Sequence, residues 1–62
     1  MYKVHMGGDW YLCTGRIGMC GQHSVREAHA DEYSTAAQAS AAIGAAKPAF
    51  VGQSVLWQIV AR

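Results

Sequence analysis

The sequence is poor in charged residues and has no long hydrophobic run. Only 15% of its 62 residues are charged, and five lysines and arginines against four acidic residues leave a net charge of +1. Proteins that bind a nucleic-acid backbone need a cluster of basic residues, and proteins that imitate one need a cluster of acidic residues. We therefore do not expect nucleic-acid binding. Glycine, glutamine, serine and charged residues interrupt every apolar stretch long before the roughly 18 residues of a membrane span, so we expect no membrane association.

Cysteine is also scarce, with Cys13 and Cys20 alone. The first six residues lack the basic region, apolar run and cleavage site of a secretory signal, so we expect a cytoplasmic protein. Cysteines stay reduced there, which disfavours a Cys13–Cys20 disulfide. The chain, residues 1–62, has the length of a single domain and too little core for a catalytic pocket of a few hundred Å³. We expect a non-enzymatic protein without a cofactor.

Residues 1–14 have the pattern of a β-hairpin. Residues 2–6 and 10–13 each alternate between two faces, as strands do. Between them, Gly7-Gly8 can supply the positive φ angles of a tight two-residue turn. In the second run Trp10 and Leu12 should face one side and Tyr11 and Cys13 the other. We expect Trp10 in the core.

The middle of the chain has weaker signals. Residues 15–21 contain three glycines, which predicts a loop. Residues 22–33 are mostly polar, and we interpret them as an irregular connector that contains a short edge strand. This segment and the glycine-rich loop are natural places for specificity because loops on a scaffold commonly carry recognition residues.

A helix and a strand are expected in the second half. Ser34-Thr35 can cap a helix that ends by Ala46 or Lys47, because Pro48 cannot continue it. Its inner face should hold Ala36, Ala39, Ile43 and Ala46. Residues 54–62 alternate with both faces largely apolar, with Trp57 on the core side, which predicts a central strand. The fold class is α+β: a three- to four-stranded antiparallel sheet with one helix packed on one face, in the order ββαβ or βββαβ.

This order of elements resembles small proteins encoded by bacteriophages and mobile elements. The likeness is carried by residues 2–6, by Asp9-Trp10-Tyr11-Leu12, by Tyr33-Ser34-Thr35 with Ala39 and Ile43, and by residues 55–60. Such proteins include anti-CRISPR proteins and other inhibitors of host defence. The resemblance implies a phage-encoded inhibitor that binds a bacterial host protein, such as a CRISPR-Cas component, by protein–protein contact.

Five residues are the candidates for contact with that partner: Tyr11, Arg16, Arg26, Asp31 and Glu32. Tyr11 should lie on the sheet face opposite the helix, where an exposed aromatic can anchor an interface. From residue 34 to residue 60 the only charged residue is Lys47. A solvated helix normally carries charges, so this half of the chain is also a candidate surface for a homodimer.

Two alternatives remain open. Cys13, Cys20, His23 and His29 are zinc-ligand types, and Cys20 and His23 have the spacing of a chelating pair, which would make the protein a small zinc-stabilised module. Aromatic residues on the sheet could instead stack the bases of a single-stranded nucleic acid. Bound metal would identify the first alternative, and a salt-dependent gel shift the second.

Overall fold

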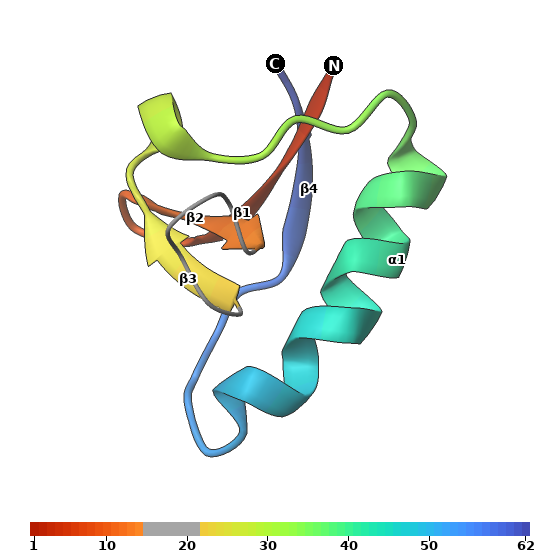
Figure 1. Ribbon diagram of the computed structural model, residues 1–62. Helices are drawn as coiled ribbons and strands as arrows, with labels where there is room; N and C mark the ends of the chain where they lie inside the picture. Colours follow the sequence, from red (N-terminus) through yellow and green to blue (C-terminus); the bar gives the residue numbers. More distant parts are fainter. Residues whose placement is uncertain (15–21) are drawn as a thin grey trace.

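The computed structural model describes residues 1–14 and 22–62, with Gln22 and His23 described by their backbone alone. The elements are β1 (Tyr2–Gly7), β2 (Trp10–Thr14), β3 (Gln22–Val25), the 3-10 helix η1 (Glu27–His29), α1 (Ala36–Ala46), the 3-10 helix η2 (Lys47–Phe50) and β4 (Gln58–Ala61). The strands form one antiparallel sheet in the order β3-β2-β1-β4. Helix α1 lies on one side of it and η1 on the other (Figure 1). The α+β fold with one helix on an antiparallel sheet is confirmed.

The β1–β2 hairpin forms where the glycines predict it. Gly7 and Gly8 have φ angles of 108° and 56°, in the left-handed region that glycine enters without a steric penalty. Gly7 pairs with Trp10, so the two residues that connect the strands are Gly8 and Asp9, one position later than the predicted Gly7-Gly8 turn. The register shifts between His5 and Gly7, and this irregularity changes the local direction of β1.

The polar connector contains the expected edge strand, since β3 pairs with β2 alone. Residues 15–21, the predicted glycine-rich loop, lie outside the described residues. After η1 the chain returns to the sheet. The Asp31 amide donates to the Leu12 carbonyl at 3.2 Å, and Tyr2 and Tyr33 exchange two backbone hydrogen bonds of 2.8 Å each. The connector is therefore attached to both β1 and β2.

Helix α1 begins and ends as predicted. The Gln38 amide donates to the hydroxyl of the N-cap Thr35 at 3.1 Å, which satisfies one first-turn donor, and the Gln38 side chain accepts from the amide of Ser34, before the N-cap, at 3.0 Å. Pro48 then lies in η2. Ala36 is exposed, contrary to the expectation, and burial along α1 begins at Ala39. The core consists of Val4, Met6, Leu12, Ala39 and Ala46, with Ile43, Val55, Trp57 and Ile59 packed against it.

The prediction of a central last strand is wrong. Only residues 58–61 form a strand, and β4 lies at the edge of the sheet, paired with β1. The tight β1–β2 turn already places β2 on the other side of β1, so no second strand can border β4 from this hairpin. None of the described helices is long and apolar enough to cross a membrane.

Candidate functional site

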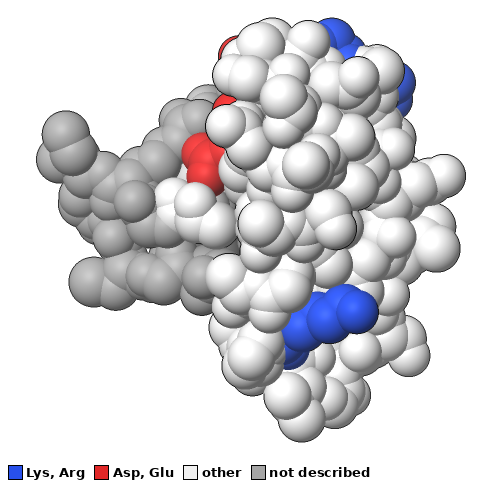
Figure 2. All heavy atoms as spheres, turned by 90° about the vertical axis from the view of Figure 1, so that its right-hand side faces the viewer, with Lys and Arg blue, Asp and Glu red and all other residues white. Residues whose placement is uncertain are grey.

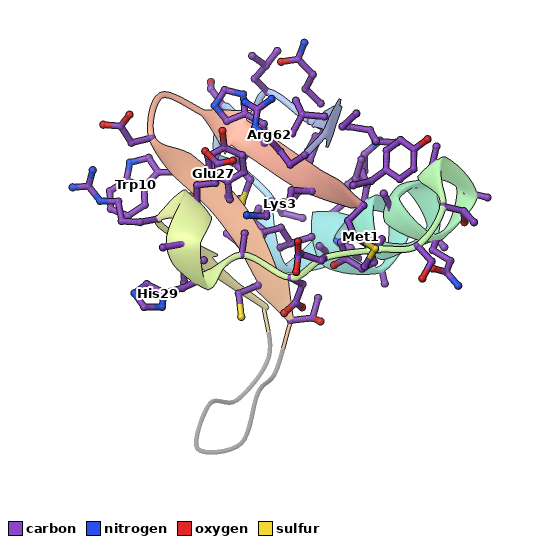
Figure 3. The ribbon with its side chains drawn as sticks, turned by 90° about the horizontal axis from the view of Figure 1, so that it is seen from above. Met1, Lys3, Trp10, Glu27, His29 and Arg62 are labelled. Atoms are coloured by element: carbon purple, nitrogen blue, oxygen red, sulfur yellow. The ribbon has the colours of Figure 1, made fainter. Side chains whose placement is uncertain are left out.

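Trp10 is a large aromatic residue on the surface. It is 47% exposed, so the prediction that it belongs to the core is wrong, whereas Trp57 is half-buried against the core as expected. Trp10 directly follows the hairpin turn, and Figure 3 shows it at the end of the molecule far from α1. Helix α1 therefore does not cover this end of the sheet.

Arg26 contacts the exposed indole, and Asp9 in turn contacts Arg26. The guanidinium carbon of Arg26 lies 4.9 Å from the centroid of the Trp10 ring, a cation–π geometry. Arg26 Nη1 also lies 3.3 Å from Asp9 Oδ2. With side chains 65% and 82% exposed, this ion pair contributes at most about 1 kcal/mol. Together the contacts limit the rotamers of Trp10 and Arg26. We call Asp9, Trp10 and Arg26 the Trp10 patch.

Tyr11, predicted to be an exposed anchor, is only 6% exposed. Its ring stacks on His5 with centroids 4.8 Å apart, and its hydroxyl accepts from Arg62 Nη2 at 3.5 Å. Element η1 packs against β2 on the same side. The exposure prediction fails because the polar connector, which has no apolar periodicity, folds back over this face of the sheet.

An ion cluster fastens η1 to the sheet. Glu27 Oε2 lies 2.8 Å from Arg62 Nε and 4.0 Å from Lys3 Nζ, and Lys3 Nζ also donates to the Glu27 carbonyl at 3.1 Å. Figure 3 shows Glu27 between Lys3 and Arg62. Hydrogen bonds with Tyr11 and Glu27 raise the pKa of Arg62 above its ordinary value. The cluster explains how a polar segment stays closed over Tyr11.

The other predicted contact residues fall in different surroundings. Asp31 is half-buried and accepts hydrogen bonds from the Thr14 amide at 2.8 Å and the Thr14 hydroxyl at 2.7 Å, so its carboxylate anchors the connector. Glu32 is exposed, and Arg16 lies outside the described residues. Of the five candidates, Arg26 and Glu32 are therefore on the described surface. Sequence reasoning missed Trp10, although its position next to a turn was a usable signal.

The Tyr33 hydroxyl lies near this anchor. Its oxygen is buried and has no hydrogen-bond partner among the described residues. Burial is the main cause that raises the pKa of Tyr33 above its ordinary value of 10.0, and the Asp31 carboxylate adds to the effect. A polar contact with the Thr14 side chain, which does not reach hydrogen-bond geometry, acts in the opposite direction and lowers the pKa of Tyr33.

The zinc-ligand set is only partly described. Cys13 is buried, with its Sγ 3.7 Å from Asp31 Oδ1, and His29 is exposed. Cys20 and the His23 side chain lie outside the described part of the structure. Among the side chains that are described, no three histidine, cysteine or acidic residues gather in a metal-binding arrangement, so the zinc module stays a prediction. The described residues also enclose no pocket, and the candidate site is therefore a surface.

The outer side of α1 is almost uncharged. Figure 2 shows it as a broad neutral surface with few charged side chains. The exposed helix residues are alanine, glutamine, serine and glycine.

Comparison with models of protein families, with curated proteins and with solved structures finds no match.

Proposed function

We propose that this protein is a non-enzymatic binding protein that contacts another protein through the Trp10 patch. The observation that carries the proposal is the exposed indole of Trp10, held beneath Arg26 at 4.9 Å. Tryptophan and arginine are the residue types most enriched among those that dominate binding energies at protein interfaces. Exposing such a ring has a solvation cost that a partner would remove.

The Trp10 patch is suited to binding because its side chains have little conformational freedom left to lose on association. Each rotamer-rich side chain that becomes immobile on association costs roughly 0.5–1.5 kcal/mol. Arg26 is already held between the Trp10 ring and Asp9, which lies 3.3 Å away, so part of that cost is met in the free protein. The patch also combines an apolar surface with one positive and one negative group, which permits hydrogen bonds and ion pairs around a central anchor.

The same arrangement gives less support to a single-stranded nucleic acid as ligand. A stacked base would use the Trp10 ring, but the nearest cation, Arg26, is already paired with Asp9. Phosphate binding requires cations whose charge is not neutralised by a neighbour. The resemblance to phage-encoded inhibitors makes a bacterial host protein, such as a CRISPR-Cas component, the first class of partner to test.

Affinity capture with a matched pair of variants tests the proposal. Immobilised wild-type protein, Trp10→Ala and Leu56→Ala are incubated with bacterial lysate; Leu56 is a suitable control because it is 59% exposed and lies outside the patch. We expect a partner that wild type and Leu56→Ala retain and Trp10→Ala loses. With the purified partner, titration calorimetry should show a loss of about 2 kcal/mol or more for Trp10→Ala.

Two outcomes would contradict the proposal. In one, Trp10→Ala, shown by circular dichroism to be folded, binds the partner as tightly as wild type. In the other, none of the three immobilised proteins retains a partner from the lysate at low or moderate salt concentration.

A further inference from the structure

The outer edge of β4 has no neighbouring strand among the described residues. β4 pairs with β1, and no backbone group in residues 1–14 or 22–62 pairs with its other side. Such an edge offers free amides and carbonyls to any strand that approaches, and proteins commonly protect it with lysine, proline, a bulge or a covering segment. The strand is Gln58-Ile59-Val60-Ala61, which contains neither lysine nor proline, and its pairing with β1 is regular.

The register identifies the backbone groups that face outward. Val60 pairs with Lys3 and Ile59 with Val4, and the Arg62 amide donates to the Met1 carbonyl at 2.8 Å. In an antiparallel ladder, residues that bond to the neighbouring strand alternate with residues that point away from it. Arg62, Val60 and Gln58 therefore bond to β1.

Ile59 and Ala61 consequently direct their amides and carbonyls to the open side. Among the described residues the Ala61 carbonyl accepts one long hydrogen bond, from Arg62 Nη1 of its own chain at 3.5 Å, and its second lone pair remains available. Ala61 and Gln58 are exposed, and Ile59 and Val60 are partly exposed. The edge is thus accessible and has hydrogen-bonding groups to offer.

We propose that this edge binds β4 of a second copy of the chain, antiparallel, with the two-fold axis at Val60. Ile59 of each copy then faces Ala61 of the other, and each of these pairs exchanges two backbone hydrogen bonds. The two sheets become one continuous sheet. The proposal goes beyond binding through the Trp10 patch, because it uses a different surface and a different partner.

A second copy fits this edge because the strand is complementary to itself. An antiparallel pairing across a two-fold axis brings the same residues together from both sides. Val60 meets Val60 at the axis, in a non-hydrogen-bonded position where side chains approach closely. Gln58 lies opposite Arg62, whose guanidinium can donate to the amide oxygen. The two Arg62 side chains lie at opposite ends of the pairing, so like charges do not face each other.

Helix α1 is compatible with this pairing. It packs against both β1 and β4, so it lies near the open edge. A two-fold axis perpendicular to the sheet places the helices of both copies on the same side of the joined sheet. Their outer surfaces, uncharged over most of their extent (Figure 2), would approach without repulsion.

Sedimentation equilibrium from micromolar to millimolar concentration tests the pairing, with Ala61→Pro as the main variant. Proline removes the outward amide of residue 61 but no hydrogen bond to β1, and proline is tolerated on an edge strand in that orientation. Two of the intermolecular hydrogen bonds are lost by symmetry, so we expect the association constant to fall roughly tenfold or more. Ala61→Thr, which keeps the amide, is the matched control and should dimerise like wild type.

Val60→Glu provides a second, independent variant. Within one copy the new carboxylate faces Lys3 across β1 and β4, so the fold should survive. At the two-fold axis, however, two carboxylates would oppose each other, and we expect the variant to be a monomer throughout the concentration range. Trp10→Ala should leave association unchanged, which separates this result from the test of the Trp10 patch.

Amide hydrogen exchange shows which groups pair. We expect the Ile59 and Ala61 amides to become protected as the concentration rises, while the Val60 amide is protected at every concentration by its bond to β1. The proposal is overturned if wild type remains a monomer at millimolar concentration. It is also overturned if a dimer forms that Ala61→Pro and Val60→Glu do not weaken, or whose Ile59 and Ala61 amides exchange freely.

Discussion

Replacing Tyr33 with phenylalanine should stabilise this protein. The Tyr33 ring packs against the core, while its hydroxyl oxygen is buried without a hydrogen bond to any described residue. The substitution removes that oxygen and keeps the ring, together with the two backbone hydrogen bonds to Tyr2. The substitution leaves no donor without a hydrogen-bond partner, because the neighbouring Thr14 hydroxyl donates to Asp31 at 2.7 Å.

The expected gain is large compared with the stability of so small a domain. A buried polar group without a partner costs about 1–3 kcal/mol, and the lost contacts of one oxygen offset part of that, so Tyr33→Phe should add about 1 kcal/mol at neutral pH. A domain of this length has a free energy of unfolding of roughly 3–9 kcal/mol. In thermal unfolding, 1 kcal/mol corresponds to an increase in Tm of about 4–8 °C.

The stabilisation of Tyr33→Phe relative to wild type should increase in alkaline solution. Burial raises the pKa of Tyr33 above 10.0, so above that pH the unfolded chain releases a proton that the folded protein retains. The unfolded state then binds fewer protons than the native state, and the free energy of unfolding falls as pH rises. Below pH 10 both states hold the proton and this contribution is zero. Phenylalanine cannot titrate, so the variant lacks the part of the alkaline decline that Tyr33 causes.

Urea unfolding at pH 7 and at alkaline pH, followed by tryptophan fluorescence, measures both effects. Tyr11→Phe is the matched control: its hydroxyl does have a partner, Arg62, at 3.5 Å, so its loss should be neutral or slightly destabilising. The reasoning is refuted if Tyr33→Phe lowers the free energy of unfolding at pH 7. It is also refuted if variant and wild type lose the same stability between pH 7 and alkaline pH.

Three further substitutions test the helix and the core. Thr35→Ala removes the acceptor of the Gln38 amide and should cost about 1 kcal/mol in urea unfolding, whereas Ser34→Ala should change little because that side chain makes no hydrogen bond to a described residue. Gly44→Ala should raise Tm, because the new methyl group meets no atom within 4 Å and helix interiors favour alanine by roughly 0.5–1 kcal/mol; a lower Tm would contradict the helix geometry. Leu12→Ala should cost about 2–5 kcal/mol and leave much of the protein unfolded by circular dichroism, and a fully folded variant would show that this fully buried side chain is not central to the core.

Local features of the structure could be predicted from the sequence. Alternation in residues 2–6 and 10–13, with Gly7-Gly8 between them, predicts the hairpin, because positive φ angles and period two are properties of adjacent residues. Thr35 and Pro48 likewise predict both ends of α1, since capping and the missing proline amide act within one turn. These signals depend on a few neighbouring residues.

The order of the strands and the covering of the sheet faces depend on contacts between distant residues. Alternation assigns Trp10 and Tyr11 to opposite faces but does not say what covers each face. Trp10 is exposed because α1 does not reach it, and Tyr11 is buried because η1 is held over it by Glu27 and its ion pairs. The edge position of β4 has the same origin. Its apolar pattern fits a central strand equally well, and its position at the edge is shown only by its pairing with a single strand, β1. Local sequence therefore determines the elements, whereas both candidate binding surfaces arise from the parts of the sheet that the packed elements leave uncovered.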